Sequence, residues 1–370
     1  MTGNEQRLYP LRFKEVLRNY GFGNRWIVEE FAKTDLPEDH RIAETWEVVD
    51  RPGESSVVMN GPLAGRSLHE IIDEYGEAFL GRDVVARNGM RFPLLIKFLD
   101  ASNPLGEQIH PNDEAAAAMG SDDPGKTEAW YMLRVRPGAT IHCGNVPGLD
   151  RETLVQALMR GESRSCMNER KVAPGDAFLL YAGTMHYSAG GVLFYEIMQN
   201  SDITIGLNRV ANEGLEGDAL AERAGQVADM IHLEEGFEPR TRQVTVTHGR
   251  NRQTYTMACR YFSLERWDLA EPWVVNMDGE QFWVLSAIEG RVDVVCGDMR
   301  ETLLAGHSCL LPANLGEVRI EPVGQAALLK AYLPNLKKDV IEPLRRAGVS
   351  DESILGIGGT TRLNDLAPLL

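Results

Sequence analysis

Residues 92–133 read FPLLIKFLDASNPLGEQIHPNDEAAAAMGSDDPGKTEAWYML, a stretch in which short apolar runs alternate with turn residues. The run 94–99 is apolar and β-type apart from Lys97, and a second run, 128–133, follows the turn Asp123-Pro124-Gly125. Short strands separated by Pro and Gly turns are typical of β-sandwiches and barrels. The stretch therefore predicts a β-rich fold, and it also carries polar side chains that could bind a metal or take part in catalysis.

Four side chains in and near this stretch are donor types found in metal sites. Gln108 and His110 are two residues apart, the spacing that puts both side chains on one face of a strand. Glu128 opens the next strand and could meet that pair across a sheet, and His186, in the loop 182–186, is the candidate fourth ligand. This set suits Zn²⁺, Mn²⁺, Co²⁺ or Fe²⁺. Spacing alone leaves open the alternative that these histidines merely lie near turns.

The remaining strand patterns are numerous and the helical ones few. Residues 42–49 alternate apolar and polar positions as a half-buried strand does. Since the sequence also contains no Gly-rich phosphate loop, the pattern favours a mainly β sandwich or jelly-roll barrel with a few peripheral helices over a doubly wound α/β sheet. Further strands are expected at 139–143, 177–181, 192–198, 243–247, 261–267, 282–288 and 290–295, and helices at 68–78, 151–161, 213–235 and 336–346.

Two similar segments indicate a duplicated unit. Residues 173–182 read APGDAFLLYA and residues 304–313 read LAGHSCLLPA, about 130 residues later. The later half lacks a Gln-x-His pair, and its His307 falls on the turn side of a strand, which predicts a structural role for that half. We therefore expect an N-terminal region with a metal-binding β domain at 1–212, a helical connection at 213–240, a second, metal-free β domain at 241–335, and a C-terminal helix and tail at 336–370.

Composition limits the partners of the chain. The 370 residues are 43% hydrophobic and 25% charged, as in ordinary globular proteins, and the net charge of −16 disfavours nucleic acid and anionic membranes. No apolar run is long enough for a transmembrane helix, and the N-terminus lacks a signal-peptide pattern. The five cysteines show no C-x-x-C pairing and are expected to be buried thiols. We expect a cytoplasmic monomer or homodimer that binds a small molecule.

Several strings resemble those of a known family. FPLLIKFLDASNPLGEQIHPNDE, GKTEAWYML, PGDAFLLYAGTMH and YEIMQNSD are similar to segments of the type I phosphomannose isomerases, the two-cupin, zinc-dependent mannose-6-phosphate isomerases. The resemblance is clear across residues 90–205, and IAETWEVVD, YFSLERWDL and LLPANLG extend it weakly over nearly the full length. It implies two cupin domains and aldose–ketose isomerisation of a sugar. The absence of a large helical insert between Glu128 and His186 resembles the short bacterial members.

The resemblance also assigns roles to individual residues. It implies that Gln108, His110, Glu128 and His186 hold one zinc ion (Zn²⁺) per chain, although another divalent transition metal would also fit. It assigns a substrate contact to Lys126 and places Lys97, Glu196 and Asp202 in or beside the cavity. Because isomerisation moves a proton between C1 and C2 through an enediol, Glu196 is the candidate base or its support. When the family resemblance is set aside, a buried ion pair between Lys97 and Glu196 explains these residues equally well, and Lys126 could be a solvent-exposed loop lysine.

Two positions depart from the family pattern. The family's Asn-Ser-Asp string is followed four residues after the Asp by an arginine, but here Gly206 occupies that position, and Arg209 lies three residues further on. A family serine near the substrate phosphate is Gly106. Both departures weaken phosphate recognition. Mannose 6-phosphate is the default substrate, and the alternatives are a non-phosphorylated or modified sugar, a non-catalytic metal-bearing sugar-binding cupin, and iron-dependent dioxygen chemistry.

Overall fold

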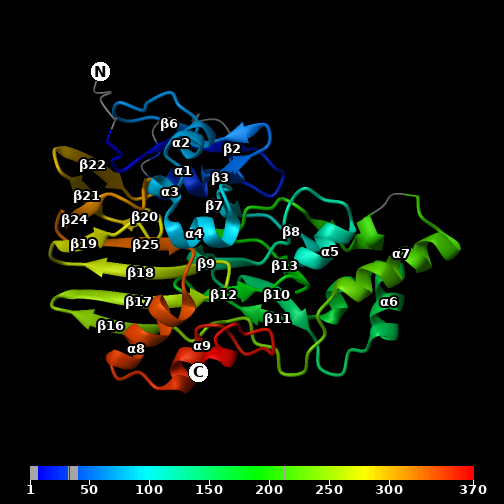
Figure 1. Cartoon of the computed structure of the whole chain (residues 1–370). Coiled ribbons are helices and arrows are strands. Elements are labelled where there is room, and N and C mark those ends of the chain that lie inside the picture. Colours follow the sequence, from blue (N-terminus) through cyan, green and yellow to red (C-terminus); the bar gives the residue numbers. More distant parts are fainter. Residues whose placement is uncertain (1–6, 32, 34–40, 212–213) are drawn as a thin grey trace.

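The computed structural model of the chain describes residues 7–31, 33, 41–211 and 214–370. Two β-rich halves lie side by side (Figure 1). The boundary expected at residues 212 and 213 lies outside the described residues. Within the described ranges no helix has the length and apolarity needed to cross a bilayer.

Two facing sheets build the first half. The six-stranded sheet has the order β12-β9-β14-β7-β3-β2, and the five-stranded sheet has the order β11-β10-β13-β8-β15. The strands of the larger sheet are β2 (Val16–Arg18), β3 (Glu44–Val48), β7 (Leu94–Ala101), β9 (Glu128–Val135), β12 (Ala177–Leu180) and β14 (Val192–Gln199). Those of the smaller sheet are β8 (Leu105–Ile109), β10 (Thr140–Asn145), β11 (Met167–Lys171), β13 (His186–Ser188) and β15 (Ile205–Gly206). Two short two-stranded sheets complete this half, β1 (Phe13–Lys14) with β6 (Val57–Val58) and β4 (Asp50–Arg51) with β5 (Glu54–Ser55).

The second half repeats this plan. Its sheets have the orders β16-β17-β18-β25-β20-β23 and β19-β24-β21-β22. The first contains β16 (Val244–His248), β17 (Asn251–Ala258), β18 (Ser263–Leu269), β20 (Trp283–Glu289), β23 (Ser308–Leu311) and β25 (Ala326–Tyr332). The second contains β19 (Trp273–Met277), β21 (Arg291–Cys296), β22 (Met299–Leu304) and β24 (Gly316–Pro322). The similar segments noted in the sequence end in β12 and β23, which are edge strands of the two six-stranded sheets.

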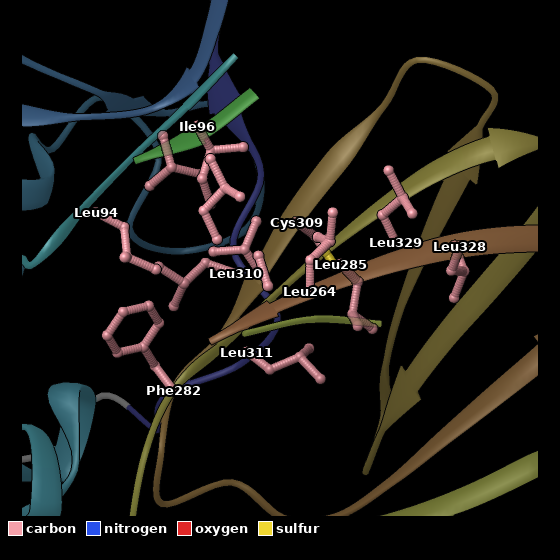
Figure 2. Close-up of a cluster of buried hydrophobic side chains, with 14 of the residues drawn as sticks. Leu94, Ile96, Leu264, Phe282, Leu285, Cys309, Leu310, Leu311, Leu328 and Leu329 are labelled. Carbon is pink, nitrogen blue, oxygen red and sulfur yellow. The ribbon is translucent and has the colours of Figure 1, made fainter. Parts of the chain in front are cut away.

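A shared apolar core joins the two halves. All eight residues of β7 are buried, because one face of the strand lines the first half's interior and the other packs on the second half. Leu94 and Ile96, on that other face, lie beside Leu310 (Figure 2). Polar contacts cross the same junction, since the Tyr195 hydroxyl lies 3.1 Å from Ser286 Oγ. The two six-stranded sheets therefore pack back to back.

Helices lie mostly at the periphery of the sheets (Figure 1). Ser67 begins α2 with a reciprocal capping box to Glu70, and Asp150 begins α6 by accepting from the Thr153 N–H. At the outer end of the first half α6 packs against α7 over a separate apolar cluster. The helices are α1 (Trp26–Glu30), α2 (Leu68–Tyr75), α3 (Glu77–Leu80), α4 (Arg82–Asn88), α5 (Asp113–Ala118), α6 (Arg151–Arg160), α7 (Gly217–Met230), α8 (Glu342–Arg346) and α9 (Asp351–Gly356), with short helical turns η1 (Ser163–Cys166), η2 (Asn208–Ala211), η3 (Leu336–Ile341) and η4 (Ala367–Leu369).

Most expected elements are confirmed to within a few residues, and all five cysteines are free and buried. One detail was wrong. Residues 44–48 were expected to be half-buried, but every residue of β3 is buried because both faces of its sheet are covered. The C-terminal tail beyond residue 346 contains α9.

Candidate functional site

Four donor side chains, Gln108, His110, Glu128 and His186, meet between the two sheets of the first half. Gln108 on β8 pairs with His186 at the start of β13, and cross-strand partners present their side chains on the same face. Glu128 begins β9 in the opposite, six-stranded sheet. The sequence suggested that Glu128 meets the Gln108–His110 pair across one sheet, but the structure brings them together across the interior between two sheets. His186, expected in a loop, is the first residue of a strand.

The distances within this group are short. Glu128 Oε2 lies 3.2 Å from His110 Nε2, and Glu128 Oε1 lies 3.3 Å from His186 Nε2. The ligand-type atoms of the three residues all lie within 4.8 Å of one another, and all three residues are buried. Gln108 Nε2 lies 3.0 Å from His186 Nε2, and a half-turn of the amide would bring Oε1 to the same place. Four potential ligands therefore surround one point.

Hydrogen bonds at the far side of each imidazole fix which nitrogen faces the centre. His110 Nδ1 lies 2.8 Å from the Ile203 carbonyl oxygen, and His186 Nδ1 lies 2.9 Å from the Thr184 carbonyl oxygen. A carbonyl accepts a hydrogen bond only from N–H, so both Nδ1 atoms carry the proton and both Nε2 atoms present lone pairs inward. Among the described residues, His110 Nε2 and both Glu128 oxygens have no hydrogen-bond partner.

The pKa shifts of His110, His186 and Glu128 also favour a metal-binding role. Burial, reinforced by the charge of Lys126, lowers the pKa of His110 to about 4. Burial also lowers the pKa of His186. Burial raises the pKa of Glu128, but the charges of Lys126 and the histidines outweigh it and hold that pKa well below its usual range. At neutral pH two neutral imidazoles and a carboxylate thus aim lone pairs at one point, and such a set fits a divalent cation.

A second group of buried charges adjoins this cluster on the inner face of the six-stranded sheet. Lys97 Nζ lies 3.2 Å from Glu44 Oε2 and 3.6 Å from Glu196 Oε2. Trp130 Nε1 donates to Glu196 Oε1 over 2.8 Å. Burial, followed by the negative charge of Glu128, raises the pKa of Glu196 to about 7, although Lys97 opposes the shift. A carboxyl with a pKa near neutrality can both take and return a proton at physiological pH.

Lys126 is buried, with its Nζ 3.2 Å from Glu128 Oε2, so the alternative of a solvated loop lysine was wrong. Asp113 fixes the chain that leads into Lys126, because its Oδ1 accepts from the Gly125 N–H over 2.9 Å and from Gln199 Nε2 over 3.0 Å. A Cβ on Gly125 would lie 2.4 Å from the Asn112 carbonyl carbon, so only glycine allows this close approach.

A side chain from the second half completes this support. The hydroxyl of Tyr261 donates to Asp113 Oδ2 over 2.6 Å. Tyr261 lies just before β18, so the second half reaches the segment that carries Lys126. Sequence reasoning did not identify this contact, because nothing in the pattern around Tyr261 indicates a partner 148 residues away.

The two glycine positions border the metal-ligand group. Gly206 pairs with Gln108 across β15 and β8, so a side chain at position 206 would share a face with Gln108 and His186. Apart from the chain neighbours of Gly106, no atom of the described residues lies within 4 Å of the place where a Cβ on Gly106 would stand. Arg209 is exposed and its Cγ lies against Gly161 at the end of α6, so it does not fill the place beside Gln108.

Of the four residues expected in or beside the cavity, Lys97, Lys126 and Glu196 are buried next to the cluster, whereas Asp202 is exposed. The charge of Asp202 still contributes to raising the pKa of Lys97. Sequence reasoning missed Glu44 and Trp130. A lysine inside an apolar strand needs carboxylate partners, and this requirement could have directed attention to Glu44.

Comparison with known proteins identifies the family. Residues 11–129 match the profile of the phosphomannose isomerase type I catalytic domain, and residues 251–332 match that of the mannose-6-phosphate isomerase cupin domain. The chain is 31% identical over 327 residues to the mannose-6-phosphate isomerase ManA of Bacillus subtilis, covering 88% of this chain and 99% of that protein. The chain belongs to the mannose-6-phosphate isomerase family. It is therefore an enzyme of the sugar isomerase class with a mainly β, two-cupin fold.

Other members of this family align over most of the chain. The mannose-6-phosphate isomerase of Streptococcus mutans is 27% identical over 306 residues, covering 83% of this chain and 93% of that protein. The crystal structure of the mannose 6-phosphate isomerase from B. subtilis superposes with a TM-score of 0.74 at 25% identity, covering 88% of this chain and 99% of that chain. A phosphomannose isomerase from Salmonella typhimurium shares the fold, with a TM-score of 0.71 at 20% identity and coverage of 88% and 100%.

Proposed function

We propose that the chain interconverts mannose 6-phosphate and fructose 6-phosphate through an enediol. The observation that carries the proposal is the inward convergence of His110, Glu128 and His186, with Gln108 as a fourth ligand, in a member of this family. A divalent metal, with zinc as the first candidate, would polarise the sugar's carbonyl and hydroxyl oxygens when bound there.

The protein's own groups carry the remaining steps of the proposed reaction. Glu196 moves the proton between C1 and C2, since its raised pKa suits both removal and return of a proton. Lys97 and Trp130 orient that carboxyl through the ion pair and the indole hydrogen bond. Lys126 binds the substrate's oxygens from its buried position, and Asp202 lies at the outer edge of the site.

A second substrate class is favoured by one specific observation. Gly206 lies beside Gln108 on the face of the metal-ligand group, where an arginine would supply a guanidinium for a phosphate. Glycine at positions 206 and 106 offers no side-chain donor to a substrate phosphate. A non-phosphorylated or differently substituted sugar does not need such a donor and therefore fits the site.

One substrate panel with the metal-loaded, full-length chain tests both proposals. Mannose 6-phosphate and free mannose are supplied separately, and exchange of the C2 hydrogen with solvent deuterium is followed together with ketose formation. Gln108→Ala and His186→Ala should abolish exchange. His142→Ala is the matched control, because His142 lies in the same sheet with its ring against Tyr187, on the opposite face.

The outcomes separate the candidates. Turnover of mannose 6-phosphate alone supports the default reaction, and turnover of free mannose alone supports the second class. If neither sugar exchanges its C2 hydrogen while the chain binds one metal ion per molecule, the isomerase proposal is wrong. Gly206→Arg with Gly106→Ser should shift preference toward the phosphorylated sugar.

A further inference from the structure

A cavity of about 330 Å³ lies in the second half, between the hairpin of β16 and β17 and the end of α8. The helix lies beside this hairpin (Figure 1). The volume is at the lower end of the usual range for small-molecule sites. At roughly 30 Å³ per water-sized group, the cavity has room for about ten non-hydrogen atoms. It is lined by Val246, His248, Gln253, Tyr255, Pro343, Arg346 and Ala347.

The walls of the cavity are mainly apolar. Val246 and Gln253 are cross-strand partners, so their side chains lie on one face of the hairpin, and Tyr255 shares that face. Pro343 and Ala347, at α8, form the opposite wall. Tyr255 is almost fully buried and forms the floor. A compact apolar body suits these walls better than a sugar with a hydroxyl on nearly every carbon.

Arg346 is the only arginine, lysine or carboxylate residue in this lining. Within the described part of the chain, its guanidinium forms no hydrogen bond and no ion pair. Its neighbour Arg345, in contrast, donates two N–H groups to Asp351, each over 2.8 Å. Burial, followed by the charge of Glu265, raises the pKa of Tyr255, and the charge of Arg346 opposes this rise. The Arg346 charge therefore acts on the floor of the cavity, and its donors remain available to an anion.

Two carboxylates that act on Tyr255 from outside the cavity are engaged by other groups. Glu265 Oε1 lies 3.3 Å from Lys330 Nζ. Asp339 Oδ2 accepts from the Asn335 N–H over 2.7 Å. Neither carboxylate belongs to the lining. An anion bound to Arg346 would therefore meet no carboxylate inside the cavity.

The other two polar side chains of the lining are bonded to each other. Gln253 Nε2 donates to Glu265 Oε2 over 2.8 Å, which fixes the amide so that its Oε1 lies 3.0 Å from His248 Nε2. A carbonyl oxygen accepts only from an N–H group, so this imidazole nitrogen carries a proton. The Gln253 oxygen and this His248 nitrogen are thus already paired, and the Arg346 guanidinium is the strongest donor left for a ligand.

One cation among apolar walls selects a ligand with a single negative charge. A carboxylate matches the planar fork of a guanidinium through two parallel N–H···O bonds. A phosphate monoester carries up to two negative charges, and the second would be buried against an apolar wall without a partner. The ring of Tyr255 also favours a flat apolar body. These features together describe a small aromatic or branched aliphatic acid.

We propose that the cavity between β16, β17 and α8 is a binding site for a small organic monocarboxylate. Its carboxylate pairs with Arg346, and its apolar body packs among Val246, Tyr255 and Pro343. The site lies outside the first half's metal-ligand group and does not depend on the reaction proposed for that group.

Isothermal titration calorimetry of the metal-loaded, full-length chain tests this site. Benzoate, phenylacetate and isovalerate are the probes, and benzamide and phenyl phosphate are comparison ligands of similar shape. Arg346→Gln removes the charge, and Ala347→Phe fills the cavity while it keeps the arginine. Arg252→Gln is the matched control, because Arg252 precedes Gln253 on β17 and therefore lies on the opposite face, also without an ion pair among the described residues. His186→Ala separates this site from carboxylate binding to a metal in the first half.

At least one carboxylate should bind with a dissociation constant on the order of 1 mM, and benzamide and phenyl phosphate at least about tenfold more weakly. Arg346→Gln should weaken binding about tenfold or more, and Ala347→Phe should abolish it. Arg252→Gln and His186→Ala should stay within about twofold of wild type.

The proposal is overturned if no carboxylate binds up to ~20 mM, or if benzamide binds as tightly as benzoate. Equal affinities in Arg346→Gln and Arg252→Gln would also overturn it, and so would loss of binding in His186→Ala. Because the readout is not turnover, an inactive isomerase would leave these results interpretable.

Discussion

The inward lone pairs of His110, Glu128 and His186 predict that the folded state depends on a bound divalent cation. Without the cation, His110 Nε2 and His186 Nε2 face the Glu128 carboxylate at 3.2 and 3.3 Å with no proton between them. Such contacts between lone pairs in a buried site raise the free energy of the native state. Metal removal should therefore lower the melting temperature, and zinc should restore it.

The size of the shift follows from linkage. A cation at a thousandfold excess over its dissociation constant stabilises the native state by ~4 kcal/mol if the unfolded chain does not bind it. Unfolding entropy near ~2.1 cal/mol/K per residue gives ~0.8 kcal/mol/K for the 370 residues. The expected rise in melting temperature is therefore ~5 °C for unfolding as one unit. Each tenfold loss of affinity in a ligand variant should remove ~1.4 kcal/mol, or ~2 °C, of this rise.

Differential scanning calorimetry of chelator-treated and zinc-loaded protein measures the shift directly. His186→Ala and Gln108→Ala should reduce it, whereas His142→Ala, on the outer face of the same sheet, should preserve it. The reasoning is refuted if the chelated and reloaded proteins melt within ~1 °C of each other, or if the ligand variants and the control show the same metal-dependent rise.

Three further predictions follow from the site. Because burial lowers the pKa of His110 to about 4 from ~6.5 in the unfolded chain, the unfolded state takes up the proton first. The unfolding free energy of the metal-free protein should then fall by up to ~1.4 kcal/mol per pH unit as the pH falls from 6.5 toward 4. Urea titrations at several pH values should show a smaller pH dependence of this free energy in His110→Gln than in the wild type. Glu196→Gln should lower kcat by ~10²–10⁴-fold and abolish the acid limb of the pH–rate profile. In the wild type that limb should lie below pH 7, because bound metal offsets the charge of Glu128 that raises the pKa of Glu196. An unchanged limb in the variant would exclude Glu196 as the proton carrier. Tyr261→Phe removes the hydrogen bond to Asp113, which fixes the segment that carries Lys126. The variant should therefore raise KM several-fold with a smaller change in kcat. A loss of stability at constant KM would contradict a positioning role for Tyr261.

Local pattern was sufficient to predict most of the fold. Ser67 and Asp150 begin helices because their side chains bond the first free N–H groups, and these signals are local in sequence. The spacing of Gln108 was informative for the same reason, since alternation along a strand fixes its face. Burial of every residue in β3 could not be predicted, because it depends on the second half covering the sheet's outer face.

The site was predictable as a list of donors but not as an arrangement. Glu128 and Gln108 lie in different sheets, so their meeting depends on how the sheets face each other, which no short-range spacing reports. Tyr261 and Glu44 were missed because their partners, Asp113 and Lys97, are distant in sequence. The choice of Zn²⁺, the role of Gln108 and the roles of the catalytic candidates stay predictions.

The two faces of β7 explain why the isomerase site needs the second half. Lys97 faces the site, while its neighbours Ile96 and Phe98 belong to the shared core. Figure 2 shows Ile96 in that core. In the isolated first half this face of β7 would lose its second-half neighbours such as Leu310, exposing apolar surface at ~25 cal/mol per Å² and weakening the packing that holds Lys97 between Glu44 and Glu196. The hydrogen bond that the Tyr261 hydroxyl donates to Asp113 would also be lost. The second half supplies none of the three inward-facing metal-ligand residues, yet it holds both the strand and the loop that orient the charges around them.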